Sequence, residues 1–146
     1  MPKENDTRKE WISLINETES VYNKARIKLQ LSDSANDILY AIYEFGEGCT
    51  QADICKMSWA SRQTVNSSIR KLEKDGILTL SHIDGKKKAI YLTDKGKALM
   101  QISVTSLVSA ENAALSTLTE AEQDELIRLT RKYLDGLNTQ VSLLHD

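Results

Sequence analysis

Apolar and small residues recur at alternating steps of four and three in the first part of the chain, between Asp6 and Gln30. The positions are Trp11, Ile15, Thr18, Tyr22, Ala25 and Leu29. Because a helix turns once in about 3.6 residues, this spacing places the six side chains on one face. The pattern predicts an amphipathic helix with one apolar side.

A second helix is expected to begin after Ser32, Asp33 or Ser34, since each can accept a hydrogen bond from a free N–H group of a first helical turn. Its apolar positions are Ile38, Leu39, Ile42 and Tyr43. Glycines at 46 and 48 favour an end to the helix there.

Two further helices follow at short spacing. Thr50 and Asp53 form a capping-box pattern that opens a short helix over residues 51–57, in which Ala52, Ile54 and Cys55 are expected to face inward. Ser61 is predicted to cap a longer helix over residues 62–75, whose apolar side carries Val65, Ile69 and Leu72 and which ends before Gly76. Two helices joined by so short a connection indicate a helix-turn-helix.

After Gly76 the period changes to alternation, over residues 77–82 and again over residues 89–92. The pair Asp84-Gly85 between these runs is a strong hairpin signal, because glycine accepts the positive φ of a tight turn. Lys86, Lys87 and Lys88 occupy the tip and the return strand. The hairpin is therefore expected to form a basic wing.

The last part of the chain is predicted to be helical. Thr93 or Asp94 can cap a single helix over residues 95–116, with apolar positions at Leu99, Ile102, Leu107 and Val108, and a capping box at residues 119–122 opens the final helix. In that helix two rows repeat every seven residues: Ile127, Leu134 and Val141, and Thr130, Leu137 and Leu144. A heptad-like seam needs a partner helix.

These elements predict a mainly α-helical protein with a small β-hairpin wing. We expect one domain over residues 1–146, with a winged helix-turn-helix lobe at 34–97 flanked by dimerisation helices at 1–33 and 98–146. Hydrophobic residues make up 40% and charged residues 27%, which fits a soluble globular chain. The polar start and the lack of a long apolar stretch argue against a signal peptide or membrane span and favour a cytoplasmic location.

The net charge of −2 argues against a nucleic-acid binder until its distribution is considered. Residues 56–97 carry ten Lys and Arg against four Asp and Glu, a surplus of six positive charges. The remainder carries nine against seventeen. Positive potential is thus concentrated where a polyanion could dock.

The helix after Ser61 is the expected recognition helix. We assign base-edge contacts to Arg62, Gln63 and Asn66, because Arg matches the acceptors of guanine and Gln or Asn matches adenine. The other polar candidates are Ser61, Thr64, Ser67 and Arg70, and on the wing Asp84, Lys86, Lys87 and Lys88. A solvated polar helix face is the alternative, but three adjacent lysines repel one another and favour a nearby polyanion.

Two stretches resemble the MarR (multiple antibiotic resistance regulator) family. The residues from Ser61 to Asn66, continued by Leu72-Glu73-Lys74-Asp75-Gly76-Ile77-Leu78, are similar to its recognition helix and following strand. Asp84-Gly85-Lys86 ahead of Leu92-Thr93-Asp94-Lys95-Gly96 is similar to its wing motif, although Lys86 stands where the family usually has Arg. The resemblance implies a transcription regulator, a repressor by expectation, that binds pseudo-palindromic double-stranded DNA as a homodimer joined through its first and last helices.

The resemblance also implies a small aromatic or anionic effector bound between the dimerisation helices and the DNA-binding lobe. Candidate pocket residues are Trp11, Tyr22, Arg26, Tyr40 and Tyr43, although core or dimer-interface roles are the favoured interpretation of the aromatic ones.

Some members of the family sense oxidants through cysteine. Cys49 lies in a Gly-rich turn, where exposure is expected, and is a candidate redox residue, whereas Cys55 is expected in the core. Two distant histidines and the cysteine spacing predict no metal site, and we expect no cofactor. The sequence contains no catalytic motif, so an enzyme is not expected. The alternative interpretations of the function are a winged-helix protein–protein adaptor and a cysteine-based redox regulator.

Overall fold

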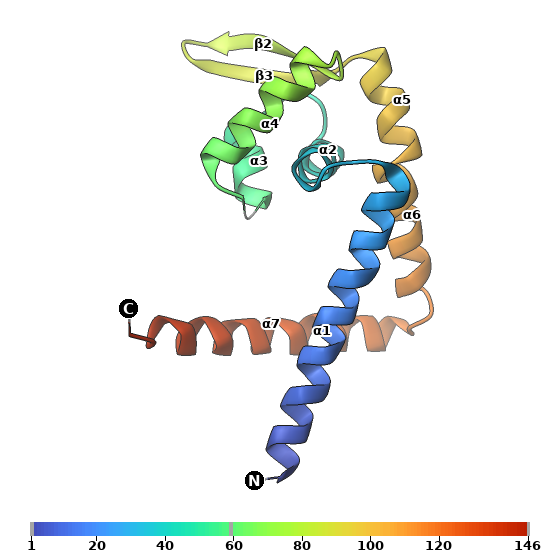
Figure 1. The fold of residues 1–146 in the computed structure, drawn as a ribbon, viewed down its shortest axis with the longest axis vertical. Helices are drawn as coiled ribbons and strands as arrows, with labels where there is room; N and C mark the ends of the chain where they lie inside the picture. The colour runs from blue at the N-terminus through green and yellow to red at the C-terminus, as the bar shows by residue number, and fades with distance from the viewer. Residues whose placement is uncertain (1, 59, 146) are drawn as a thin grey trace. The chain divides into compact units, whose positions relative to one another are not determined.

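The computed structural model describes residues 2–58 and 60–145, with side chains from residue 6 onward (Figure 1). In chain order the elements are α1 (Pro2–Leu29), α2 (Asp33–Phe45), β1 (Cys49–Thr50), α3 (Gln51–Met57), α4 (Arg62–Lys74), β2 (Leu78–Asp84), β3 (Lys87–Leu92), α5 (Asp94–Ile102), α6 (Val104–Leu115) and α7 (Glu120–Ser142). The mainly helical fold with a small antiparallel sheet confirms the predicted fold class.

The chain divides into two compact units, Met1–Leu107 and Val108–Asp146. The first holds the predicted helix-turn-helix and wing, and the second holds α7. The finer division into a lobe at 34–97 and dimerisation helices on either side stays a prediction.

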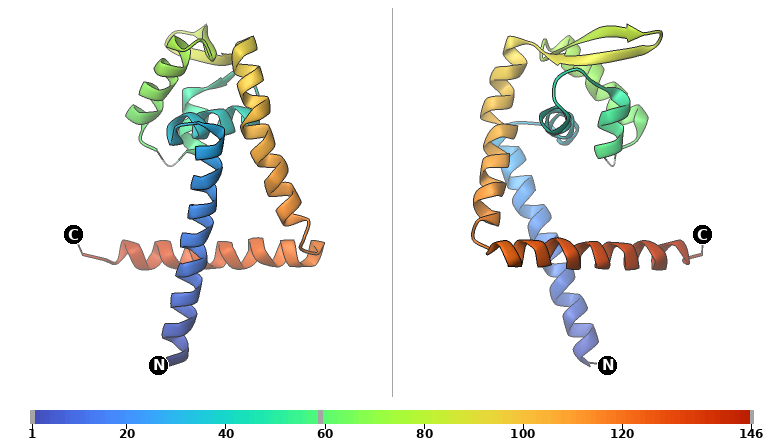
Figure 2. Two further views of the ribbon diagram at one scale, coloured as in Figure 1. Left: turned by 45° about the vertical axis from the view of Figure 1, so that its right-hand side comes forward. Right: turned by 180° about the vertical axis from the view of Figure 1, so that it is seen from behind.

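The core of the first unit lies where α2, α3 and α4 meet the sheet (Figures 1 and 2). Its fully buried side chains come from several elements: Ile38, Leu39 and Ile42 on α2, Ile54 on α3, Leu78 and Ile90 on the strands, and Val104 at the start of α6. The apolar side predicted for α4 is confirmed, since Val65, Ile69 and Leu72 are all buried. Burial of this side leaves the opposite side of α4 in solvent.

The predicted caps hold the helices of this unit at the expected places. Ser32 caps α2, Ser61 caps α4, and Thr50 and Asp53 form the complete capping box of α3, with each residue's side chain bonded to the other's backbone N–H. Gly76 follows α4 with a φ of 75°, the left-handed conformation expected after a helix.

The hairpin belongs to a three-stranded antiparallel sheet in the order β1-β3-β2. The two-residue strand β1 pairs with β3 through Cys49 and Ile90 and was not predicted, because two residues give no alternation. The tight turn also differs by one position: Asp84 pairs with Lys87, so the loop is Gly85-Lys86 instead of Asp84-Gly85. Gly85 has the positive φ that the prediction required.

The predicted single helix over residues 95–116 is wrong, because it is broken at Ser103. The φ and ψ of Ser103 are −112° and −87°, and its hydroxyl and its backbone N–H both bond to the carbonyl oxygen of Leu99. A serine that bonds back to the fourth preceding carbonyl competes with regular helix geometry. Ile102, one of the apolar positions of that predicted helix, is 67% exposed, and Ala52 on α3, expected to face inward, is also exposed.

In the second unit, Thr119 and Glu122 form the predicted capping box of α7. Ile127, Leu134 and Val141, one row of the predicted seam, are 68%, 39% and 53% exposed in the single chain. Within the described part of the chain, no helix combines the length and the hydrophobicity that crossing a membrane requires.

Candidate nucleic-acid interface

The N-terminal end of α4 is fixed by its cap. The Ser61 hydroxyl accepts a hydrogen bond from the Thr64 backbone N–H at 3.1 Å, and the two hydroxyl oxygens lie 2.8 Å apart. Both hydroxyls therefore already take part in the cap. Arg62 and Gln63, the next residues, are exposed at the start of the helix.

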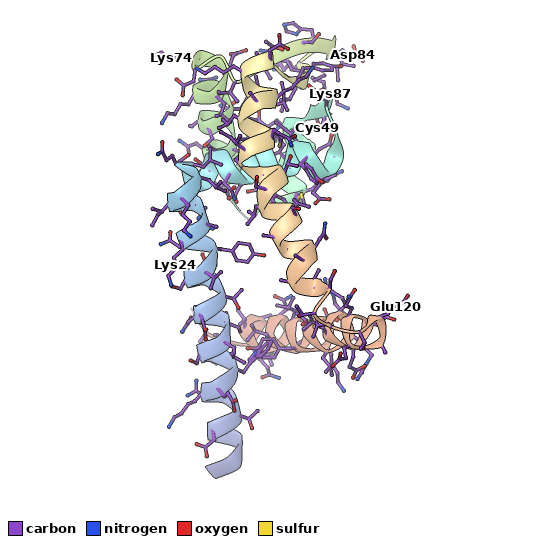
Figure 3. The ribbon with its side chains drawn as sticks, turned by 90° about the vertical axis from the view of Figure 1, so that its right-hand side faces the viewer. Lys24, Cys49, Lys74, Asp84, Lys87 and Glu120 are labelled. Atoms are coloured by element: carbon purple, nitrogen blue, oxygen red, sulfur yellow. The ribbon has the colours of Figure 1, made fainter. Side chains whose placement is uncertain are left out.

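The far end of the hairpin is polar and open to solvent. Every residue from 81 to 88 is exposed, and the strands pair there through His82 with Lys88 and Asp84 with Lys87. Figure 3 shows Asp84 and Lys87 on the hairpin and Lys74 on α4. The three lysines of the wing thus lie at the tip of a two-stranded antiparallel hairpin.

Helix α4, the predicted recognition helix, and the wing border a common groove of about 650 Å³. The lining combines Arg62, Asn66 and Arg70 of α4 with Lys86, Lys87 and Lys88 of the wing, and is completed by Thr50, Gln51, Ala52, Asp53, Lys56, Ile69, Glu73, Leu80 and Ile90. The structure therefore brings six of the predicted DNA-contact residues together. The other five, Ser61, Gln63, Thr64, Ser67 and Asp84, lie outside this lining.

The charge of the groove is strongly unbalanced. Six of its lining side chains are cationic, namely Lys56, Arg62, Arg70, Lys86, Lys87 and Lys88, and two are acidic, namely Asp53 and Glu73. A concave surface lined by one sign of charge focuses the field and attracts a polyanion. Lys56 belongs to the basic segment 56–97 but was not predicted as a DNA contact, because an ordinary charge in the last turn of α3 explains it equally well.

Asp53 remains ionised at neutral pH. Hydrogen bonds from the backbone N–H and the side chain of Thr50 lower the pKa of this carboxyl group. Its charge serves the cap of α3, which explains why an acid is tolerated within a basic groove.

The five candidate effector residues lie on α1 and α2. Trp11, Tyr22 and Tyr40 are half-buried, and Tyr43 is 43% exposed. The Arg26 guanidinium lies 2.8 Å from a carboxylate oxygen of Asp33 and 3.3 Å from one of Glu19. In this structure Arg26 thus bridges α1 to the start of α2.

A second cavity, of about 490 Å³, lies in the first unit behind α4. Its lining comes from the α1–α2 connection, α2, α4, the α4–β2 connection and α5: Gln30, Leu31, Ser32, Ser34, Ala35, Ser68, Lys71, Leu72, Asp75, Ile77, Lys95 and Leu99. It contains none of the five candidate effector residues. Lys95 is held by a 2.9 Å hydrogen bond to the Asp75 carbonyl oxygen.

The cysteines are placed differently from the expectation. Cys49, labelled in Figure 3, is 6% exposed in strand β1. Cys55 on α3 is only partly buried. Burial, and then the nearby Asp53 charge, raise the pKa of the Cys49 thiol. A raised thiol pKa lowers the fraction of reactive thiolate at neutral pH. Among the described residues, no cluster of three or more His, Cys, Asp and Glu could hold a metal ion.

Helices α2 to α4 and the hairpin define the fold of the chain as a winged helix-turn-helix. The MarR family model matches residues 29–89, which contain α2 to α4 and most of the wing. The predicted resemblance to the MarR family is therefore confirmed, and the chain carries the winged-helix fold of these transcription regulators.

Solved structures extend the likeness beyond the matched segment. A MarR family regulator from Neisseria meningitidis, NMB1585, is 19% identical, with 91% of this chain and 94% of that chain covered and a TM-score of 0.77. MepR of Staphylococcus aureus in complex with DNA is 25% identical over 86% of this chain and 96% of that chain, with a TM-score of 0.69. BpsR of Bordetella bronchiseptica, whose DNA binding is regulated by 6-hydroxynicotinic acid, is 22% identical over 80% and 98%, with a TM-score of 0.55. No curated protein sequence matches this chain.

Proposed function

We propose that this protein is a sequence-specific, non-catalytic transcription regulator, a repressor, that binds a pseudo-palindromic site on double-stranded DNA as a homodimer. The observation that carries the proposal is the basic groove in which Arg62, Asn66 and Arg70 of α4 face the wing lysines. MepR, a relative of similar fold, is known in complex with DNA.

The two sides of the groove suit different parts of a duplex. A helix can enter the major groove, where Arg and Asn can pair with base edges, so Arg62 and Asn66 are the candidates for reading sequence. Lys86, Lys87 and Lys88 carry compact charges without the planar fork of Arg, and they suit phosphates. Gln63 adds a base-reading candidate on the exposed start of α4.

The exposed apolar seam of α7 supports the homodimer. A row with Ile127, Leu134 and Val141 between 39% and 68% exposed is costly for a single chain in water. A second copy would bury the same seam against itself, as a symmetric interface requires. Two copies would also present two recognition helices, which a pseudo-palindromic site needs.

Release by a small molecule is the finer part of the proposal. BpsR shows that a protein of this fold can couple DNA binding to a small aromatic acid. For this chain the candidate positions are Trp11, Tyr22, Tyr40 and Tyr43, while Arg26 would have to leave Glu19 and Asp33 to bind an anion.

Selection of binding sites from random duplex DNA, with the purified full-length protein at moderate salt and no added ligand, tests the proposal. Enrichment of a pseudo-palindrome, with log affinity falling by about 0.9 per log unit of salt for each phosphate neutralised, is the expected result. Failure to enrich any sequence would overturn the proposal and favour the adaptor interpretation.

A further inference from the structure

The turn between α2 and β1 contains a side chain that reaches the base of the wing. A carboxylate oxygen of Glu47 accepts a hydrogen bond from the backbone N–H of Leu92, the last residue of β3, at 2.8 Å. The backbone N–H of Gly48, the next residue of the turn, donates to the carbonyl oxygen of Ile90, also at 2.8 Å. The turn is thus attached to β3 at two points.

The side chain of Glu47 takes the place of a strand residue that is missing. The ladder between β1 and β3 stops at the pair of Cys49 with Ile90. Continued by two residues in the same antiparallel register, β1 would bring position 47 opposite Leu92, but Gly48 has a φ of 89°, so the backbone leaves the strand there. The carboxylate supplies the missing acceptor, and a hydrogen bond to an ionised oxygen is stronger than one to a neutral carbonyl.

The base of the wing is consequently held on both sides of β3. On the side away from Glu47, Leu92 pairs with Leu78 of β2. The backbone N–H of Thr93 then donates to the carbonyl oxygen of Ile77 at 3.0 Å. The tip is open by comparison, because every residue from 81 to 88 is exposed. The direction of the tip therefore depends on the bonds at its base.

We propose that Glu47 is a positioning residue of the DNA interface, an inference that rests on the proposed function. Glu47 lies outside the lining of the groove between α4 and the wing, so its effect on phosphates is indirect. Its bond to Leu92 holds β3 in the direction that brings the wing beside α4. In that direction Lys86, Lys87 and Lys88 neutralise phosphates while α4 lies in the major groove.

The test compares Glu47→Gln with Glu47→Ala on the duplex recovered by the selection, at several salt concentrations. Both variants lose the same negative charge, but Gln keeps an oxygen that can accept from the Leu92 N–H and Ala does not. The side chain is exposed, so neither change disturbs the core, and urea unfolding checks that both variants are folded. We expect E47A to bind about fivefold more weakly than E47Q, with a salt slope smaller by about one, because one phosphate contact is lost.

A second comparison separates positioning of the wing from a general effect on stability. Lys87→Ala is added to each of the two variants. If Glu47 acts through the wing, this change should cost less affinity in E47A, where the lysine is already misplaced, than in E47Q. A loss of stability alone would leave the salt slope of the folded protein and the cost of Lys87→Ala unchanged.

The outcomes distinguish this inference from the proposed function. If the wild type prefers the selected duplex while E47A and E47Q bind it alike with the same salt slope, the positioning role is refuted and the proposed function stands. Equal costs of Lys87→Ala in the two variants would also refute the positioning role. A wild type without any preference for the selected duplex would overturn the proposed function itself.

Discussion

Gly96 allows the start of α5 to approach the turn that leads into the wing, and Gly96→Ala tests this junction. A Cβ atom at position 96 would lie 1.9 Å from the carbonyl oxygen of Ile77 and 3.0 Å from its carbonyl carbon. Cβ contacts below 3.0 Å are essentially never seen, so the two segments would have to separate by about 1.1 Å. Both atoms belong to the backbone, and no change of rotamer can relieve the clash.

The separation would disturb the hydrogen bonds that join the wing to α5. The Ile77 carbonyl oxygen accepts from the Thr93 backbone N–H at 3.0 Å and from its hydroxyl at 3.1 Å, and that hydroxyl accepts from the Gly96 N–H at 3.0 Å. Overpacking of a core costs about 1–3 kcal/mol, and each weakened hydrogen bond adds about 1 kcal/mol. We expect G96A to lower the free energy of unfolding by about 3–5 kcal/mol, a large share of the ~5–15 kcal/mol typical of a folded protein.

Urea unfolding followed by circular dichroism, at one protein concentration, measures the effect. Gly136→Ala is the matched control, because a Cβ at that position in α7 meets nothing within 4 Å and alanine favours a helix by about 1 kcal/mol over glycine. G136A should raise the unfolding midpoint slightly while G96A lowers it strongly. A G96A protein as stable as the wild type would show that the close approach of Gly96 to Ile77 does not exist.

The remaining predictions concern the surfaces. Arg62→Ala should relax base preference at one position of the selected site. Lys87→Ala should instead weaken binding to all duplexes and reduce the salt slope by about one. Equal effects of the two variants in a binding titration would contradict the assigned roles. Leu134→Glu places a charge in the exposed seam of α7, so a protein that is dimeric at micromolar concentration should become monomeric in sedimentation velocity. A variant that stays dimeric would exclude this seam as the dimer interface. Iodoacetamide should label Cys55 well before Cys49 in the folded protein, because Cys49 is buried and its thiol pKa is raised. Mass spectrometry measures the labelling, and faster labelling of Cys49 would contradict its buried placement.

The sequence predicted most of the helical framework, because its signals are local. The caps at Ser32, Ser61 and Thr119 each need only a few neighbouring residues, and all three are present. The apolar side of α4 was equally readable, since Val65 and Ile69 recur at helical spacing. The basic wing followed from an alternating pattern around Asp84-Gly85, although the loop is one residue further on.

Most of the features that the sequence did not predict depend on contacts between distant parts of the chain. Strand β1 exists because Cys49 pairs with Ile90, forty-one positions away in the sequence. Cys49 is buried there, although the neighbouring glycines had predicted an exposed turn. The break at Ser103 is local, but no glycine or proline marks it in the sequence. Nor could sequence spacing show that Lys56 of α3 lines the same groove as the wing lysines.

The distribution of charge also bears on how DNA would approach. The chain has a net charge of −2, yet the groove between α3, α4 and the wing has a surplus of four positive charges in its lining. Outside residues 56–97 the acidic side chains exceed the basic ones by eight, so other surfaces repel the phosphate backbone while this groove attracts it. If the protein binds DNA as proposed, repulsion elsewhere would limit non-specific binding and would favour an orientation with α4 toward the duplex. A protein of overall acidic charge can therefore be a selective DNA binder, because its specificity depends on where its charges lie and not on their sum.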